Sequence, residues 1–276
     1  MPRFYGRNIS VEIIRLLCFN TTIYSNRLKT KTMKKATRST SQFAGVPRGR
    51  TGFFGGFLLI LLLFRAAPLS AQSPIRINFQ SDEIGRIPSG WLYWNEKSTA
   101  KVYSVQAEGE KRFLHAEARG TMYQLGYEHR WDLQEFPWLQ WQWRAVLFPV
   151  GTDEREKSKN DSVLGLYVVF GHWPLIKTIK YIWSDTLPVG TSFTSPYSST
   201  TRILVVRSGR ARQGTWVTER RNVLSDYRQL YGEVDKAPIA SGIAVLTDSD
   251  DTHSMAIGDY TDIRTSARED SRALVP

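Results

Sequence analysis

Residues 139–148, LQWQWRAVLF, set the expected architecture of the chain. In an extended strand, successive side chains point to opposite faces of the sheet. The opposite face of this stretch carries glutamine and arginine, whereas its apolar face consists of Leu139, Trp141, Trp143 and Ala145. We therefore expect a strand whose tryptophan face belongs to a hydrophobic core.

The sequence around this stretch is a series of similar short segments. Six more runs are rich in β-branched and aromatic residues and are separated by turn residues: 101–106, 113–118, 163–170, 201–208, 215–220 and 243–247. This spacing favours an all-β fold, an antiparallel β-sandwich, over alternating strands and helices. One short helix is predicted near 225–232, where Ser225 can cap its start and Gly232 its end.

The first 71 residues differ from the remainder in charge. The chain holds 37 Lys and Arg against 26 Asp and Glu, a net charge of +11. Twelve of the bases and one of the acids lie in residues 1–71, so this leader carries 12 − 1 = +11 and the remainder 25 − 25 = 0. A neutral remainder removes the usual reason to expect a nucleic-acid partner, and we predict none.

Residues 33–71 have the three parts of a secretory signal peptide. A basic stretch precedes the apolar run FFGGFLLILLLF (53–64), and small residues follow as far as Ala71. The run is shorter than the roughly 20 residues that cross a bilayer. We predict export to the periplasm or the medium, cleavage near Ala71 and no membrane span in the mature protein. Residues 1–32 are interpreted as an upstream extension of the reading frame.

The expected mature protein, residues 72–276, is a single domain. The only cysteine, Cys18, precedes it, so this part has neither a disulfide nor thiol chemistry. No internal repeat or low-complexity linker divides it, and its length suits one sandwich. The tail after about residue 264 is expected to be disordered.

A series of aromatic-rich motifs resembles one known family. Its pieces are GRIPSGW (85–91), WDLQEFPWLQWQWR (131–144), EKSKNDSVLGLYVVF (156–170), YIWSDTLPVGT (181–191), WVTERRNVLSDYRQLYG (216–232) and GIAVLTDSDDT (242–252). Over about residues 77–264 the chain resembles the bacterial exported domain-of-unknown-function family 3047. That resemblance implies an exported protein without an assigned reaction. The chain departs from the family pattern at Asn160, where an acid is usual, and at Asp251, where asparagine is usual.

Two segments also resemble parts of jelly-roll carbohydrate-binding modules. They are residues 131–144 and 243–264, which are similar to an aromatic strand and to the last strand pair of those modules. The likeness implies a sandwich of the jelly-roll type, and it bears on fold rather than on function.

Two acidic segments are candidate sites. In residues 152–162, Lys157 and Asp161 could point over a binding face, although a solvated hairpin loop has the same composition. In residues 247–252, Asp248, Asp250 and Asp251 could collect calcium, which prefers several oxygen ligands. The alternative there is an acidic turn at the end of a strand. Calcium is the only cofactor indicated.

The third candidate is WVTERRN, residues 216–222. Trp216, with Trp183 elsewhere, could stack on a sugar ring while polar groups take the hydroxyls: Glu219, Arg220 and Asn222. Surface salt bridges explain the same charges. Glu219 and Asp248 are the pair considered for glycoside cleavage by two carboxylates.

Three functions therefore remain open. The first is a binding module for a saccharide or another envelope component. The second is a carboxylate-dependent hydrolase of the glycoside type on the same scaffold. The third is a structural partner in an envelope complex that uses the tryptophan face for protein contact.

Overall fold

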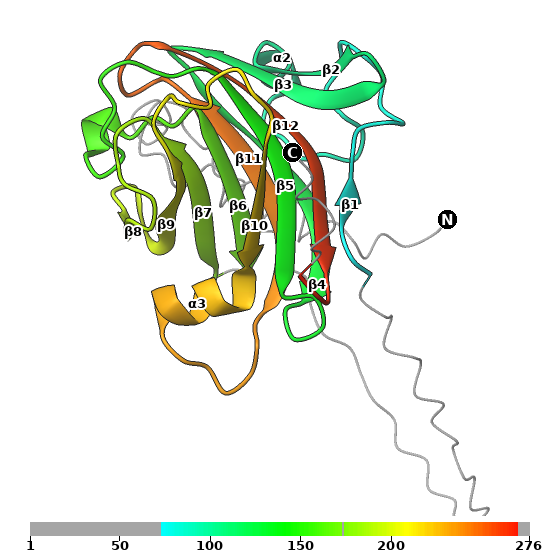
Figure 1. The fold of residues 1–276 in the computed structure, drawn as a ribbon, viewed down its shortest axis with the longest axis vertical. Helices are drawn as coiled ribbons and strands as arrows, with labels where there is room; N and C mark the ends of the chain where they lie inside the picture. Colours follow the sequence, from blue (N-terminus) through cyan, green and yellow to red (C-terminus); the bar gives the residue numbers. More distant parts are fainter. Residues whose placement is uncertain (1–72, 173, 270–276) are drawn as a thin grey trace, which may run out of the picture. The chain divides into compact units, whose positions relative to one another are not determined.

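The computed structural model describes residues 73–172 and 174–269. The leader, its cleavage site and the upstream extension therefore lie outside the described residues. Those residues form a β-sandwich of the jelly-roll type with few helices, as the sequence predicts (Figure 1). Within this part of the chain, no helix is long and apolar enough to cross a membrane.

The first sheet contains the stretch that sets the architecture. Its strands are β1 (Arg76–Ile77), β2 (Tyr103–Glu108), β3 (Lys111–Arg119), β5 (Trp138–Leu147), β10 (Val217–Asn222) and β12 (Met255–Ser266). Their order is β10-β5-β12-β3-β2, with β1 also paired to β12, and every pairing is antiparallel.

The second sheet faces the first across the core. Its strands are β4 (Met122–Asp132), β6 (Leu164–Phe170), β7 (Lys177–Ser184), β8 (Ser192–Ser195), β9 (Ser198–Ser208) and β11 (Ile239–Asp248). Their order is β4-β11-β6-β7-β9-β8, and only β7 and β9 pair in parallel among the strands described.

The core confirms the alternation predicted for β5. Leu139, Trp141, Trp143 and Ala145 are fully buried between the sheets. Trp141 stacks on Tyr181 of β7 with ring centroids 5.4 Å apart, so the tryptophan face of one sheet packs on the other. Burial of such large rings supplies most of the cohesion of a sandwich without disulfides.

Among the described residues, the helical segments between the strands are α2 (Glu96–Thr99), a 3₁₀ turn (Lys157–Lys159) and α3 (Val223–Tyr231). α3 is the helix predicted near 225–232, and it lies across one end of the sandwich in Figure 1. Its cap differs from the prediction. The Asn222 side chain accepts a hydrogen bond from the Ser225 backbone N–H, so the helix begins earlier, and Gly232 follows its end as predicted.

β12 continues to Ser266, where it is still paired with β5, and residues 270–276 of the tail lie outside the described residues. Residues 152–162 are not a solvated hairpin loop, because they cross from β5 in the first sheet to β6 in the second. Glu154, Asn160 and Asp161 are buried there.

Candidate functional site

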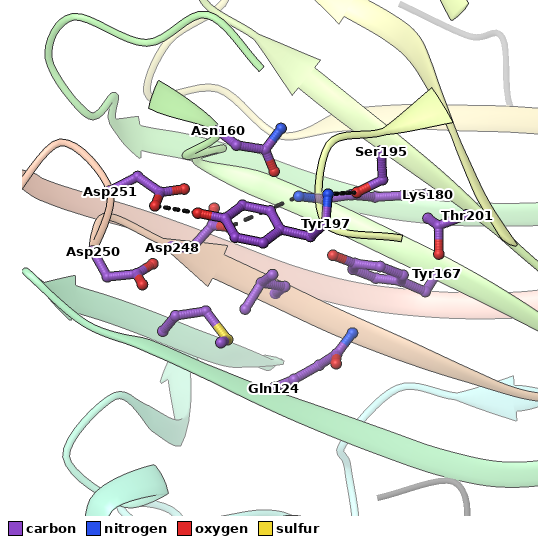
Figure 2. Close-up of a pocket in the computed structure, with 12 residues that line it drawn as sticks. Gln124, Asn160, Tyr167, Lys180, Ser195, Tyr197, Thr201, Asp248, Asp250 and Asp251 are labelled. Atoms are coloured by element: carbon purple, nitrogen blue, oxygen red, sulfur yellow. Dashed lines mark hydrogen bonds and ion pairs between the residues drawn. The ribbon is translucent and has the colours of Figure 1, made fainter. Parts of the chain in front are cut away.

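A recess opens on the outer face of the second sheet (Figure 2). The strands contribute Met122, Gln124, Tyr167, Lys180, Ser195, Thr201, Leu246 and Asp248. The connecting loops add Asn160, Tyr197, Asp250 and Asp251. The empty space is about 520 Å³, including the part that is open to solvent.

Strand alternation explains why these side chains face outward. In β6, Leu166 and Val168 are fully buried in the main core, so Tyr167 between them points to the other face. In β7, Ile179 and Tyr181 likewise face the core and direct Lys180 outward. The two strands thus place a phenol and an amine beside each other.

Lys180 and Asp248 form a buried pair in the recess. The Lys180 Nζ lies 3.8 Å from Asp248 Oδ2 and donates to Ser162 Oγ at 3.2 Å. Burial raises the pKa of Asp248 to about 8, and the Lys180 ammonium opposes that rise. Burial alone favours a neutral amine, but the attraction of Asp248 and Tyr167 holds the pKa of Lys180 above its ordinary value.

A glycine makes room for this lysine. Gly165 of β6 pairs with Ile182 of β7, and a Cβ on Gly165 would lie 2.9 Å from Lys180 Cε. The same Cβ would lie 3.3 Å from the Leu246 carbonyl oxygen. Because Gly165 has no side chain, the aliphatic part of Lys180 can pass close to the β6 backbone and reach Asp248 and Ser162.

Three aspartates gather at one edge of the recess. Carboxylate oxygens of Asp161, Asp250 and Asp251 lie within 4.8 Å of one another. Asp161 accepts hydrogen bonds from the backbone N–H groups of Asp251 and Thr252 and from the Thr252 hydroxyl. Burial and the negative charges of Asp251 and Asp161 raise the pKa of Asp250 to about 6.

Tyr197, in the turn between β8 and β9, joins this edge to the 3₁₀ turn. Its hydroxyl donates to Asp251 and lies 2.9 Å from the Lys157 carbonyl oxygen. The Lys157 Nζ lies 5.1 Å from the centre of the Tyr197 ring. Burial, together with the bond to Asp251, holds the pKa of Tyr197 well above its usual range. Figure 2 shows its ring across the mouth of the recess from Gln124.

The acidic candidates from the sequence come together here. Lys157, Asp161, Asp248, Asp250 and Asp251 all lie in or beside the recess. The carboxylates close enough to one another to hold a cation together are those of Asp161, Asp250 and Asp251. Asp248 is paired with Lys180 instead.

The tryptophan candidates lie elsewhere. Trp183 is fully buried in the core, so it offers no face to a ligand. Trp216 lies on the first sheet, where Lys111 Nζ is 4.2 Å and the Arg144 guanidinium carbon 4.7 Å from its ring centre. The predicted platform with Trp183 is therefore not formed. Trp141 and Trp143 of β5 are core as well, and they provide no protein-contact face.

The remaining candidates have structural partners. Glu219 is buried and accepts from Arg207 and from Trp143 Nε1. Arg220 donates to Gln140 on the neighbouring strand, and Asn222 caps α3. Glu219 on the first sheet and Asp248 on the second do not share a site, so the proposed carboxylate pair for glycoside cleavage does not exist in this fold.

Sequence reasoning missed several lining residues, above all Gln124, Tyr167 and Lys180. One signal was present, because a lysine in the middle of an apolar strand is buried only with a partner. Its partner could not be named, since Asp248 lies far away in the sequence and is brought near by the β11–β6–β7 pairing.

Comparison with known proteins places the chain in a family. The family model described as "Protein of unknown function (DUF3047)" matches residues 90–264, more than half of the chain. The chain belongs to this family. The recess of this DUF3047 member lies wholly within the matched residues. No curated protein matches the chain.

Solved structures with a similar strand arrangement include two carbohydrate-binding modules. One is CBM27-1 of Caldicellulosiruptor saccharolyticus in complex with mannohexaose, with 13% identity, coverage of 72% of this chain and 99% of that chain, and a TM-score of 0.36. TmCBM61 in complex with β-1,4-galactotriose has 8% identity, coverage of 69% and 94%, and a TM-score of 0.34.

A family 11 xylanase from Neocallimastix patriciarum is similar to this DUF3047 member to a comparable degree. Its identity is 10%, the coverage is 70% of this chain and 100% of the xylanase, and the TM-score is 0.33. At this level of likeness, none of these proteins decides what the recess binds. Its chemistry has to come from its own residues.

Proposed function

We propose that the recess on the second sheet binds a saccharide, such as a component of the cell envelope. Sugars present apolar C–H faces and a rim of hydroxyls, and their sites combine apolar surface with a few polar groups. The floor of the recess has this character. Tyr167 and Leu246, which line it, belong with Ala244 to an apolar cluster separate from the main core, and Met122 packs against this cluster.

The polar groups around that floor support the proposal. The Gln124 side chain lines the recess and has no hydrogen-bond partner among the residues the structure describes, so its amide can both donate to and accept from a hydroxyl. Asp250 and the Tyr197 hydroxyl add further polar atoms opposite it (Figure 2). The combination of the apolar cluster and this free amide carries the proposal.

A glycan array probed with the purified full chain tests it. We expect retention of at least one saccharide class, and Gln124→Ala should weaken that binding about tenfold, since a hydrogen bond lost at a site is worth about 1 kcal/mol or more. Gln106→Ala is the matched control, because Gln106 is a half-buried glutamine on the other sheet. An array without any retained glycan, or equal effects of the two variants, would contradict the proposal.

We also propose that the leader directs export and is then removed near Ala71. The basic stretch, the apolar run of residues 53–64 and the small residues after it support this. Mass spectrometry of the protein recovered from periplasm or medium should give an N-terminus close to Gln72. Recovery of the intact chain from the cytoplasm alone would contradict it.

A further inference from the structure

Tyr197 is an aromatic side chain of the recess that does not belong to a hydrophobic core. It lies between Ser195 and Ser198, which pair across the turn from β8 to β9, and it is partly exposed. Among the described residues, its ring packs against none of the apolar clusters. Core packing therefore does not explain why an aromatic ring lines the recess.

One face of this ring is available to a ligand. The Lys157 Nζ lies over the ring, 5.1 Å from its centre, and Lys157 does not line the recess. The cation therefore lies on the side of the ring that is turned away from the recess, and the opposite face meets the space. The electron-rich face of an aromatic ring attracts polarised C–H groups as it attracts cations.

The ring is fixed before a ligand arrives. Pro196 restricts the backbone of the turn, and the Tyr197 N–H donates to Ser195 Oγ at 3.2 Å. At the other end of the side chain, the hydroxyl donates to Asp251 and lies 2.9 Å from the Lys157 carbonyl oxygen. Because both ends are held, stacking on this ring costs little conformational entropy.

The recess has a second apolar surface opposite the ring. Tyr167 and Leu246 line it and belong to the outer apolar cluster, against which Met122 packs. Figure 2 shows the Tyr197 ring across the space from Gln124, which lies on β4 as Met122 does. Since Tyr197 lines the same recess without packing on that cluster, the space separates two apolar surfaces. A ligand between them contacts apolar groups on both of its faces.

We infer that Tyr197 is the stacking residue of the recess and that its ligand is a β-linked pyranose with equatorial hydroxyls, such as β-1,4-linked glucose. The inference rests on the proposed saccharide function and names its ligand class. Such a ring presents C–H bonds on both faces and directs its hydroxyls sideways, toward the polar rim. An axial hydroxyl, as in mannose or galactose, would contact an apolar surface without a hydrogen-bond partner, which weakens binding.

Calorimetry on the full chain tests the ligand class with cellotetraose, β-1,4-mannotetraose and β-1,4-galactotetraose. We expect cellotetraose to bind at least tenfold more tightly than the other two, because each of them leaves a hydroxyl unpaired. Comparable binding of the three would overturn the ligand class and leave the saccharide function intact. Binding of none, with another glycan retained on the array, would do the same. Binding of none together with an empty array would overturn the inference and count against the function too.

Variants of Tyr197 test the stacking role. Tyr197→Ala should weaken cellotetraose binding at least tenfold, whereas Tyr197→Phe keeps the ring and should stay within about threefold of the parent. Tyr197→Leu, which fills the turn without a flat ring, should lose as much as the alanine variant and replaces it if that variant does not fold. Trp94→Ala is the matched control, because Trp94 is 57% exposed and does not line the recess. Parent-like binding by the alanine or leucine variant, or an equal loss in the phenylalanine variant, would overturn the inference.

Discussion

Lys180 holds its charge although its side chain is almost wholly buried. Its side chain is 3% exposed, and it is kept there by Asp248 and Ser162. A buried charge without a partner is costly, whereas a buried pair replaced as a whole by uncharged groups often costs little. The pair is therefore expected to behave as a unit in stability measurements.

Lys180→Met should lower the free energy of unfolding by about 2 kcal/mol, because it leaves the Asp248 carboxyl buried without its cation. The double variant Lys180→Met/Asp248→Asn should recover most of that loss. Chemical denaturation of both variants measures it. If the double variant were as unstable as the single one, the ion pair would not be the reason for the loss.

Asp250 should make stability depend on pH. Its pKa in the folded protein is raised to about 6, above the unfolded value of about 4, so the folded state binds the proton more tightly. The contribution of this acid to the free energy of unfolding therefore increases as the pH falls from about 6 to about 4.

Asp250→Asn removes this dependence. The variant should exceed the parent in stability by about 1 kcal/mol near pH 7.5, a figure reduced for solvent screening, and the difference should close near pH 4.5. Thermal and chemical unfolding at both pH values measure it. A variant less stable than the parent near pH 7.5 would show that the Asp250 charge is compensated in the fold.

At the scale of elements, alternation in β5 was enough to predict a sandwich with a tryptophan core. β4 and β7 were not predicted as strands. β4 interrupts its apolar residues with Gln124, Gly126 and Glu128, and the outward residues of β7 are Thr178 and Lys180 beside apolar Ile182. Such irregular outer faces obscure the alternation of apolar and polar residues by which a strand is predicted. The same outer faces contribute Gln124 and Lys180 to the recess, so the sequence pattern was least informative for these residues of the site.

The pairing of β11 with β4 depends on Gly242. It lies at an irregularity in the register, and a Cβ there would be 2.6 Å from the Tyr127 carbonyl oxygen. Gly242→Ala should therefore destabilise the protein by about 2 kcal/mol, because backbone has to move to relieve the overlap. Ser199→Ala, at an exposed strand position, is the control. Equal midpoints of denaturation for the two variants would contradict this account of the β11–β4 pairing.

At the scale of the molecule, the two sheets have different outer faces. The first sheet covers its outer face with internal pairs, such as Arg144 with Asp259 and His115 with Asp259, both at 2.7 Å. The second sheet leaves a recess lined by the Gln124 amide and by the carboxylates of Asp250 and Asp251. Among the described residues, most of the tryptophan rings are buried in the core.

Hydrogen–deuterium exchange on the full chain, with and without a saccharide that the glycan array retains, tests the central claim most directly. The account predicts slower exchange in peptides covering residues 122–126, 160–170, 177–184, 195–201 and 246–252, with no change in residues 104–119 and 138–147. Protection confined to the first sheet, or no protection of the recess segments by that saccharide, would contradict it.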